Sequence, residues 1–187
     1  MEIKKVVKAF LGRIRCLKNG IVYAGGGYIG RNVNIVGGSK IRLGKDVCIR
    51  PDVDLWACGQ FIDIGAGTEI GQRSRISIAH TLTIGEKVLL SPNVYITDCD
   101  HAYEDIKIPV IDQGIIKKDY SVSIGDHSYI GINSVIVGNV RIGKHCVIGA
   151  NSVVTKDIPD YSVAVGSPAK VIKQHNFETH RWERLEI

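Results

Sequence analysis

The chain has 187 residues, a net charge of +5, 21 glycines and only 6% aromatic residues. This length suits one domain with a sizeable core, and dispersed cations without interleaved aromatic residues argue against nucleic-acid binding. The five cysteines are scattered and never spaced as C-x-x-C, which predicts reduced thiols and no zinc or disulfide framework. Because no stretch is long and apolar enough for a membrane span or signal peptide, we expect a cytoplasmic protein.

The first 18 residues place apolar side chains at helical spacing beside lysines and arginines. The pattern predicts an amphipathic helix over residues 1–18 that packs on the domain behind it and covers its open end. The alternative is a helix that rests on an anionic membrane surface as a peripheral contact. The apolar positions are Ile3, Val6, Val7, Phe10, Leu11, Ile14 and Leu17.

Residues 25–30 (GGGYIG) match the glycine pattern of dinucleotide-binding loops. That motif needs a helix directly after it and an acidic residue about 20 positions later. The residues that follow are β-branched and interrupted by glycine, so we reject a dinucleotide site.

Between residues 124 and 154 an aliphatic residue falls on every sixth position, and the same spacing can be followed back in triplets to residue 23. A fixed period of this kind is typical of a stacked repeat array. Three short strands per coil, each with one inward residue, explain the period. We predict an all-β parallel β-helix of about six coils over residues 19–173, followed by a short C-terminal arm over 174–187. The six triplets are Tyr23, Ile29 and Ile35; Leu43, Ile49 and Leu55; Ile64, Ile70 and Ile76; Ile84, Leu90 and Ile96; Ile124, Ile130 and Ile136; and Ile142, Ile148 and Val154.

Extra residues interrupt the period only after the third member of a triplet, so all insertions leave from one corner of the prism. The largest, residues 97–123, is too apolar for a disordered loop and should pack on something. Long ordered loops in compact domains usually carry function.

Four stretches resemble the hexapeptide-repeat acyltransferases, and most of all the galactoside, maltose and related sugar O-acetyltransferases. They are residues 84–101 (IGEKVLLSPNVYITDCDH), 128–131 (SYIG), 148–159 (IGANSVVTKDIP) and 166–172 (GSPAKVI). The resemblance implies a left-handed β-helix, against the usual handedness of parallel crossovers. It also implies a homotrimer in which the long loop reaches toward a neighbouring subunit.

His101 matches the catalytic histidine of this family by its position after SPNVYITDCD. Histidine suits proton transfer near neutrality because its unperturbed pKa is about 6.5. The resemblance implies that His101 is the general base that deprotonates an acceptor hydroxyl as it attacks the thioester of acetyl-CoA. A backbone amide near Gly131 and Ile132 would stabilise the oxyanion, and Asp98 or Asp100 would orient the histidine ring.

Five residues are candidates for contact with the acceptor: Asp98, Asp100, Gln72, His80 and Asn93. The coil before the insert lacks the asparagine and aspartate of the sugar acetyltransferases, which leaves the acceptor open. It is a free saccharide or a lipid-linked precursor of a surface polysaccharide.

The resemblance places the acyl donor, acetyl-CoA, on the last two coils. Small residues there leave room for the pantetheine arm, and a hydroxyl and cations are available to the phosphates. The resemblance also places an aromatic residue, Tyr129, near the thioester. The predicted contacts are Tyr129, Gly131, Ile132, Gly149, Ala150, Thr155, Lys156, Lys170 and Lys173.

Three other functions compete with O-acetyl transfer. An N-acetyltransferase of a nucleotide-linked amino sugar would use the same base and donor. A zinc enzyme would need three convergent ligands, whereas only His127 and His145 are expected to stack on adjacent coils, so no metal is predicted. A silent β-helix scaffold would not bind CoA at all.

Overall fold

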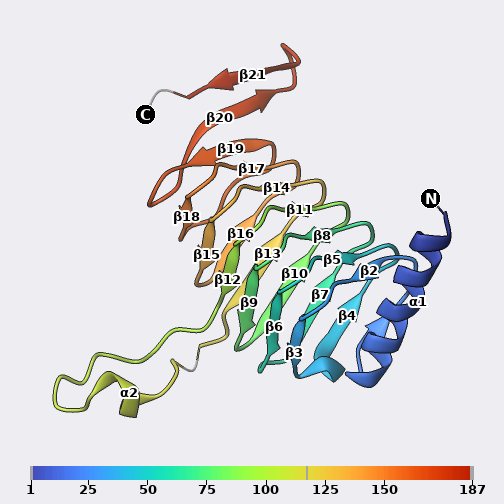
Figure 1. The fold of residues 1–187 in the computed structure, drawn as a ribbon. Helices are drawn as coiled ribbons and strands as arrows, with labels where there is room; N and C mark the ends of the chain where they lie inside the picture. Colours follow the sequence, from blue (N-terminus) through green and yellow to red (C-terminus); the bar gives the residue numbers. More distant parts are fainter. Residues whose placement is uncertain (1, 117, 186–187) are drawn as a thin grey trace.

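The six-residue period folds as three parallel sheets that form the sides of a prism (Figure 1). The computed structural model describes residues 2–116 and 118–185. Sheet A contains β1 (Val22–Tyr23), β4 (Ile41–Leu43), β7 (Phe61–Ile64), β10 (Thr81–Ile84), β13 (Ser121–Ile124) and β16 (Val140–Ile142). Sheet C contains β3 (Asn34–Val36), β6 (Asp54–Ala57), β9 (Arg75–Ile78), β12 (Tyr95–Thr97), β15 (Val135–Val137) and β18 (Val153–Val154).

Sheet B is longer because it runs on into the C-terminal residues. Its parallel strands are β2 (Tyr28–Ile29), β5 (Cys48–Ile49), β8 (Glu69–Ile70), β11 (Leu89–Leu90), β14 (Tyr129–Ile130), β17 (Val147–Ile148) and β19 (Ser162–Val165). The antiparallel strands β20 (Lys170–Asn176) and β21 (Arg181–Arg184) follow. A 3-10 turn, η1 (Gly38–Lys40), and a short helix, α2 (Val110–Gln113), lie in two of the insertions.

The register confirms all six predicted triplets. Ile84 pairs with both Ile64 and Ile124, and the equivalent residues of the other two sheets stack in the same way. The inward residues are buried, apart from half-buried Tyr23 and Ile35 in the first coil. The core is therefore three aliphatic columns, and the stability of each coil depends on its neighbours.

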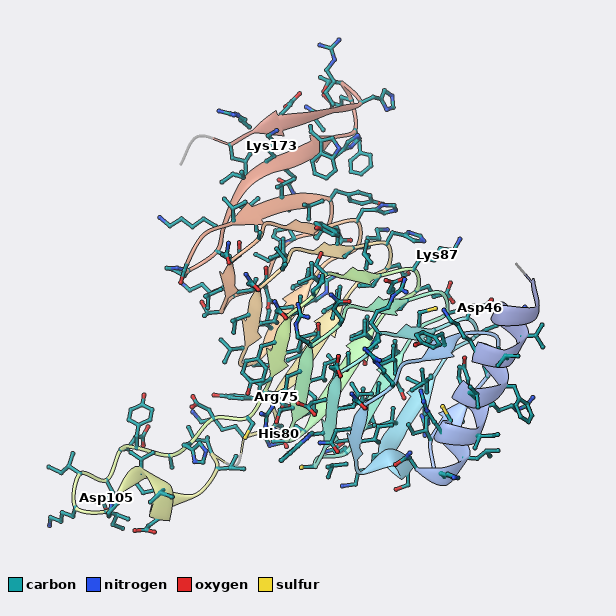
Figure 2. All side chains as sticks on the ribbon, viewed as in Figure 1. Asp46, Arg75, His80, Lys87, Asp105 and Lys173 are labelled. Carbon is teal, nitrogen blue, oxygen red and sulfur yellow. The ribbon has the colours of Figure 1, made fainter. Side chains whose placement is uncertain are left out.

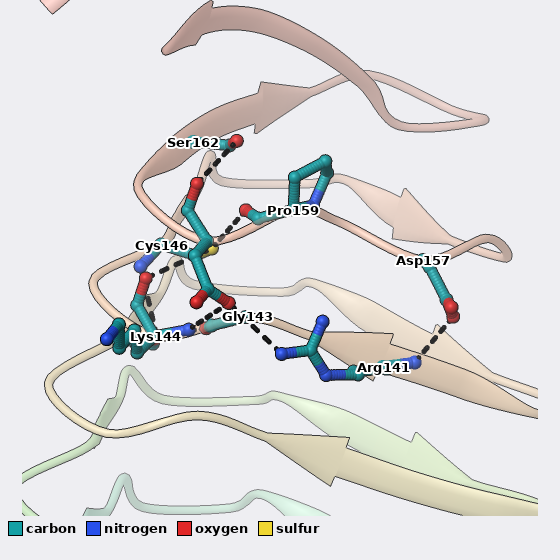
Figure 3. A network of polar contacts seen from close by, with 9 residues as sticks. Arg141, Gly143, Lys144, Cys146, Asp157, Pro159 and Ser162 are labelled. Carbon is teal, nitrogen blue, oxygen red and sulfur yellow. Dashed lines mark hydrogen bonds and ion pairs between the residues drawn. The ribbon is translucent and has the colours of Figure 1, made fainter. Parts of the chain in front are cut away.

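A partial seventh coil follows the six that the sequence predicts. Ile158 bridges to Ile142, and Ala164 pairs with Ile148. Polar contacts hold this coil: the Asp157 carboxylate accepts a bond from the Arg141 amide at 2.7 Å, and the Cys146 thiol donates to the Pro159 carbonyl at 3.0 Å (Figure 3). The predicted end of the β-helix at residue 173 falls inside antiparallel β20, and the C-terminal arm is a β-hairpin.

The helix α1 (Glu2–Lys18) lies against β1 and β2 at the N-terminal end, as predicted, but it packs through an unexpected face. Gly12 and Cys16 are buried against the first coil, while Val6, Phe10 and Leu17 are exposed. No helix in the part of the chain that the structure describes is both long and apolar enough to cross a bilayer.

All five cysteines are free thiols. Cys16 is buried on the face of α1 that packs against the first coil, and this burial raises the pKa of its thiol to about 11. A thiol with so high a pKa stays protonated at neutral pH and is a poor nucleophile.

Candidate functional site

The long insert leaves sheet C after β12 and returns to sheet A at β13, so the predicted segment, residues 97–123, also includes the last residue of β12 and the first three of β13. It projects away from the prism (Figure 1). Its apolar side chains find little cover within the chain, since Ile106 is 96% exposed and Ile111 is 84% exposed. The prediction that this loop packs on something is therefore not met by contacts inside one chain.

The base of the insert is a hydrogen-bonded ribbon. His101 and Ile115 form an antiparallel bridge. The Ala102 amide donates to the Gly114 carbonyl at 3.0 Å, and the Ile116 amide donates to the Asp100 carbonyl at 2.9 Å. This ribbon fixes the backbone on both sides of His101 and leaves the imidazole exposed at the corner.

The tip of the insert is also ordered by hydrogen bonds. The Gln113 side chain donates to the carbonyls of Asp105 at 2.9 Å and Ile108 at 2.7 Å. Figure 2 shows Asp105 far out on the loop and His80 at its root. The loop is thus a formed element that holds its apolar residues in solvent.

Asp98 anchors the root of the insert to the neighbouring corner. Its buried carboxylate accepts hydrogen bonds from the amides of Ala79 at 2.6 Å, His80 at 2.9 Å and Thr81 at 3.1 Å. These three bonds occupy both oxygens. Within this chain the Asp98 carboxylate therefore contacts the turn at residues 79–81. That Asp98 orients the His101 ring stays a prediction.

Asp100 is exposed and accepts a 2.9 Å bond from the backbone amide of His101. The contact fixes the backbone of His101, but no hydrogen bond joins the imidazole nitrogens to this carboxylate. Asp100 is thus the predicted acceptor-site carboxylate that lies next to the histidine.

His80 links the two ends of the insert, which sequence reasoning did not anticipate. Its Nδ1 atom lies 3.6 Å from an Asp98 oxygen, and its ring meets Tyr120 edge-on at 6.3 Å. The side chain is 17% exposed, and buried Nδ1 makes no hydrogen bond. The sequence gives one indication that His80 lies near both ends of the insert: the insertion at residues 79–80 and the insertion after residue 97 leave from the same corner.

The other two predicted acceptor contacts lie on the opposite edge of sheet C. Gln72 is exposed in the turn between β8 and β9. Asn93 belongs to a ladder of corner asparagines: it accepts from Arg73 at 3.1 Å and donates to Asn133, which donates in turn to Asn151. The structure thus groups His80, Asp98, Asp100 and His101 and separates them from Gln72 and Asn93.

The predicted contacts to the acyl donor, acetyl-CoA, are divided between the same two corners of the prism. Gly131 and Gly149 lie between sheets B and C, with Tyr129, Ile132 and Ala150 beside them. A Cβ on Gly131 would lie 2.6 Å from the Ala150 nitrogen, so this glycine is needed for coil stacking. Tyr129 is 39% exposed and accepts a 3.0 Å bond from the Ser91 hydroxyl.

The predicted phosphate contacts gather beyond β18. Thr155 and Lys156 are exposed where the chain leaves sheet C. The turn at 166–170 folds back on β18, because the Val153 amide donates to the Gly166 carbonyl and the Ala169 amide donates to the Val153 carbonyl. This brings exposed Lys170 to the same strand, whereas half-buried Lys173 lies farther along β20.

Residues 121–156 match the bacterial transferase hexapeptide family with six repeats. Over these residues the chain carries the repeat of the hexapeptide transferases. It is 33% identical over 175 residues to a probable acetyltransferase of Mycobacterium tuberculosis, covering 83% of this chain and 58% of the relative. It is 34% identical over 139 residues to the galactoside O-acetyltransferase of Escherichia coli K12, covering 72% and 64%.

The chain thus spans about three fifths of the length of these curated relatives. Among solved structures it is similar to AntD, an N-acyltransferase from Bacillus cereus determined with dTDP and 3-hydroxybutyryl-CoA. The TM-score is 0.71 at 22% identity, covering 89% of this chain and 90% of AntD. This likeness confirms the parallel β-helix that the six-residue period predicts, and it agrees with the left hand that the resemblance implies.

The predicted stack of His127 and His145 is confirmed, with Nδ1 of the first 3.1 Å from Nε2 of the second. Tyr161 continues the stack from the next coil. Residues 2–116 and 118–185 contain no group of three side chains able to hold a metal ion.

Proposed function

We propose that this hexapeptide-repeat transferase moves an acetyl group from acetyl-CoA to a hydroxyl of a sugar or polysaccharide precursor. The observation that carries the proposal is His101, whose backbone is fixed by a hydrogen-bonded ribbon and whose imidazole is exposed at the most elaborated corner of the β-helix. The relative named galactoside O-acetyltransferase supports the class of reaction.

In the proposed reaction His101 is a general base. Its unprotonated ring nitrogen takes the proton of the acceptor hydroxyl as that oxygen attacks the thioester carbonyl. A backbone amide near Gly131 or Ile132 stabilises the oxyanion, and collapse of the tetrahedral intermediate releases the CoA thiolate. Asp100 is the exposed carboxylate next to the base, which makes it the better placed of the two candidates to orient the ring.

The residues beyond β18 suit a CoA molecule. Its phosphates are anionic, and Lys156, Lys170 and the Thr155 hydroxyl present exposed cations and a donor near one strand. Gly149 and Ala150 are small, so they leave room for the pantetheine arm at the corner between sheets B and C. Gly131 fits less well as a ligand contact, because coil stacking alone accounts for its lack of a side chain.

A homotrimer forms part of the proposal. The ordered loop holds Ile106 and Ile111 in solvent, and a neighbouring subunit would cover them. The predicted site residues also lie at two corners of one sheet. In a trimer, the long loop of one subunit would therefore meet the predicted acetyl-CoA contacts of the next subunit.

The proposal predicts which acceptors consume acetyl-CoA. CoA release is measured with matched pairs that differ only in a hydroxyl or an amine at one carbon, such as galactose and galactosamine, and with nucleotide-linked pairs. We expect release with the hydroxyl members. Release confined to the amines would assign N-acetyl transfer instead. No release from any acceptor, together with no calorimetric binding of CoA, would indicate the scaffold role.

A further inference from the structure

The helix α1 turns its most apolar stripe away from the protein. Val6, Phe10 and Leu17 are 67%, 64% and 72% exposed, whereas Cys16 is 1% exposed. At 3.6 residues per turn, residues 6, 10 and 17 form one stripe, and buried residues 12 and 16 lie about 120° away around the helix axis.

The inner face of α1 is held by close packing and by Arg15. A Cβ on Gly12 would lie 3.2 Å from the Ile29 nitrogen, which shows how closely the helix approaches β2. The Arg15 guanidinium donates to the carbonyls of Ile29 and Gly30. The helix is therefore docked without using its apolar stripe.

The net charge of the chain is concentrated in this helix. Residues 1–18 contain six lysines and arginines and one acidic residue, so they carry the whole net charge of +5. Residues 19–187 contain 18 basic and 18 acidic residues and are neutral overall. Arg13 and Lys18 are exposed and flank the stripe, whereas Lys8 lies on the opposite side of the helix, with its Nζ 5.1 Å from the centre of the Tyr28 ring.

We propose that the outward face of α1 binds the surface of an anionic membrane. An exposed apolar stripe flanked by lysines and arginines is the pattern of helices that lie in the plane of the lipid headgroups. Each cation near an anionic surface tightens binding by about fivefold. A second copy of this chain is a poor occupant of the stripe, because two helices of charge +5 would repel each other.

Membrane binding is independent of the proposed catalytic function, so its test uses no substrate. The full chain is sedimented with phosphatidylcholine vesicles and with vesicles that also contain phosphatidylglycerol. We expect binding to the anionic vesicles to be at least about tenfold tighter and to weaken as salt is added.

Two matched pairs of variants locate the contact. Phe10→Ser should lower the vesicle affinity by about tenfold, the worth of burying one such side chain, while Phe177→Ser in the C-terminal hairpin, 60% exposed, should change it less than about twofold. Arg13→Gln should lower it by about fivefold, while Arg181→Gln, which removes the same charge from β21, should not. Thermal unfolding of each variant checks that the fold is intact.

Three results would overturn the proposal. The first is equal binding to neutral and anionic vesicles, and the second is a Phe10→Ser variant that binds as tightly as the unaltered chain. The third is a larger oligomer of the unaltered chain than of Phe10→Ser without vesicles, which would assign the stripe to a second copy.

Discussion

Replacing His101 with alanine should lower turnover by about two to four orders of magnitude, the usual contribution of a general base. The affinity for CoA should stay nearly unchanged, because His101 is proposed to act on the acceptor hydroxyl. Steady-state CoA release and calorimetric titration of CoA measure the two quantities separately.

A matched control for this variant is His127→Ala. His127 is also an exposed histidine, but it lies in the turn between β13 and β14 and stacks on His145. This control should keep the turnover of the unaltered enzyme. An equal loss of CoA affinity and turnover in His101→Ala would contradict the role of His101 as the base.

Replacing Asp98 with alanine should lower the free energy of unfolding by about 3–5 kcal/mol. The change leaves the amides of residues 79–81 without an acceptor, and each buried donor without a partner costs about 1–3 kcal/mol. The gain from no longer burying a carboxylate offsets part of that sum. Urea unfolding followed by circular dichroism measures the difference.

The control for this prediction is Asp100→Ala. Asp100 is exposed, its carboxylate accepts a bond from the amide that follows it, and its backbone bond to Ile116 is kept in the variant, so the change should stay within about 0.5 kcal/mol. If Asp98→Ala unfolds like the unaltered chain yet turns over far more slowly, Asp98 orients His101 and the anchoring role is wrong.

The β-helix could be predicted from the sequence because every coil needs an inward apolar residue at the same six-residue spacing. Residues such as Ile84, Leu90 and Ile96 recur at one period and take inward positions in three sheets, so the register follows from spacing alone. The left hand of the helix could not be derived in this way and needed the resemblance to a family.

The features that sequence reasoning missed depend on contacts between distant residues. The apolar stripe of α1 predicted a packing face, but the first coil accepts only the closer approach that Gly12 allows, so the stripe faces outward. Asp98 sits among acidic residues that suggest a site, whereas its oxygens are taken up by the turn at residues 79–81. Neither contact leaves a local signal in the sequence.

The C-terminal residues were predicted as an arm without further detail. The hairpin of β20 and β21 forms because β19 still presents an unpaired strand edge at the end of sheet B, which β20 covers. The pairing partner is an edge created by the whole β-helix, so short-range patterns could not identify it.

Direct transfer of the acetyl group from CoA to the acceptor is best tested in a single turnover with acetyl-CoA labelled in the acetyl group, quenched at successive times. We predict that the label passes from CoA to a hydroxyl acceptor at a rate that depends on His101, without label on the protein at any time. Label that accumulates on the protein before it reaches the acceptor, or transfer by His101→Ala at an undiminished rate, would contradict it.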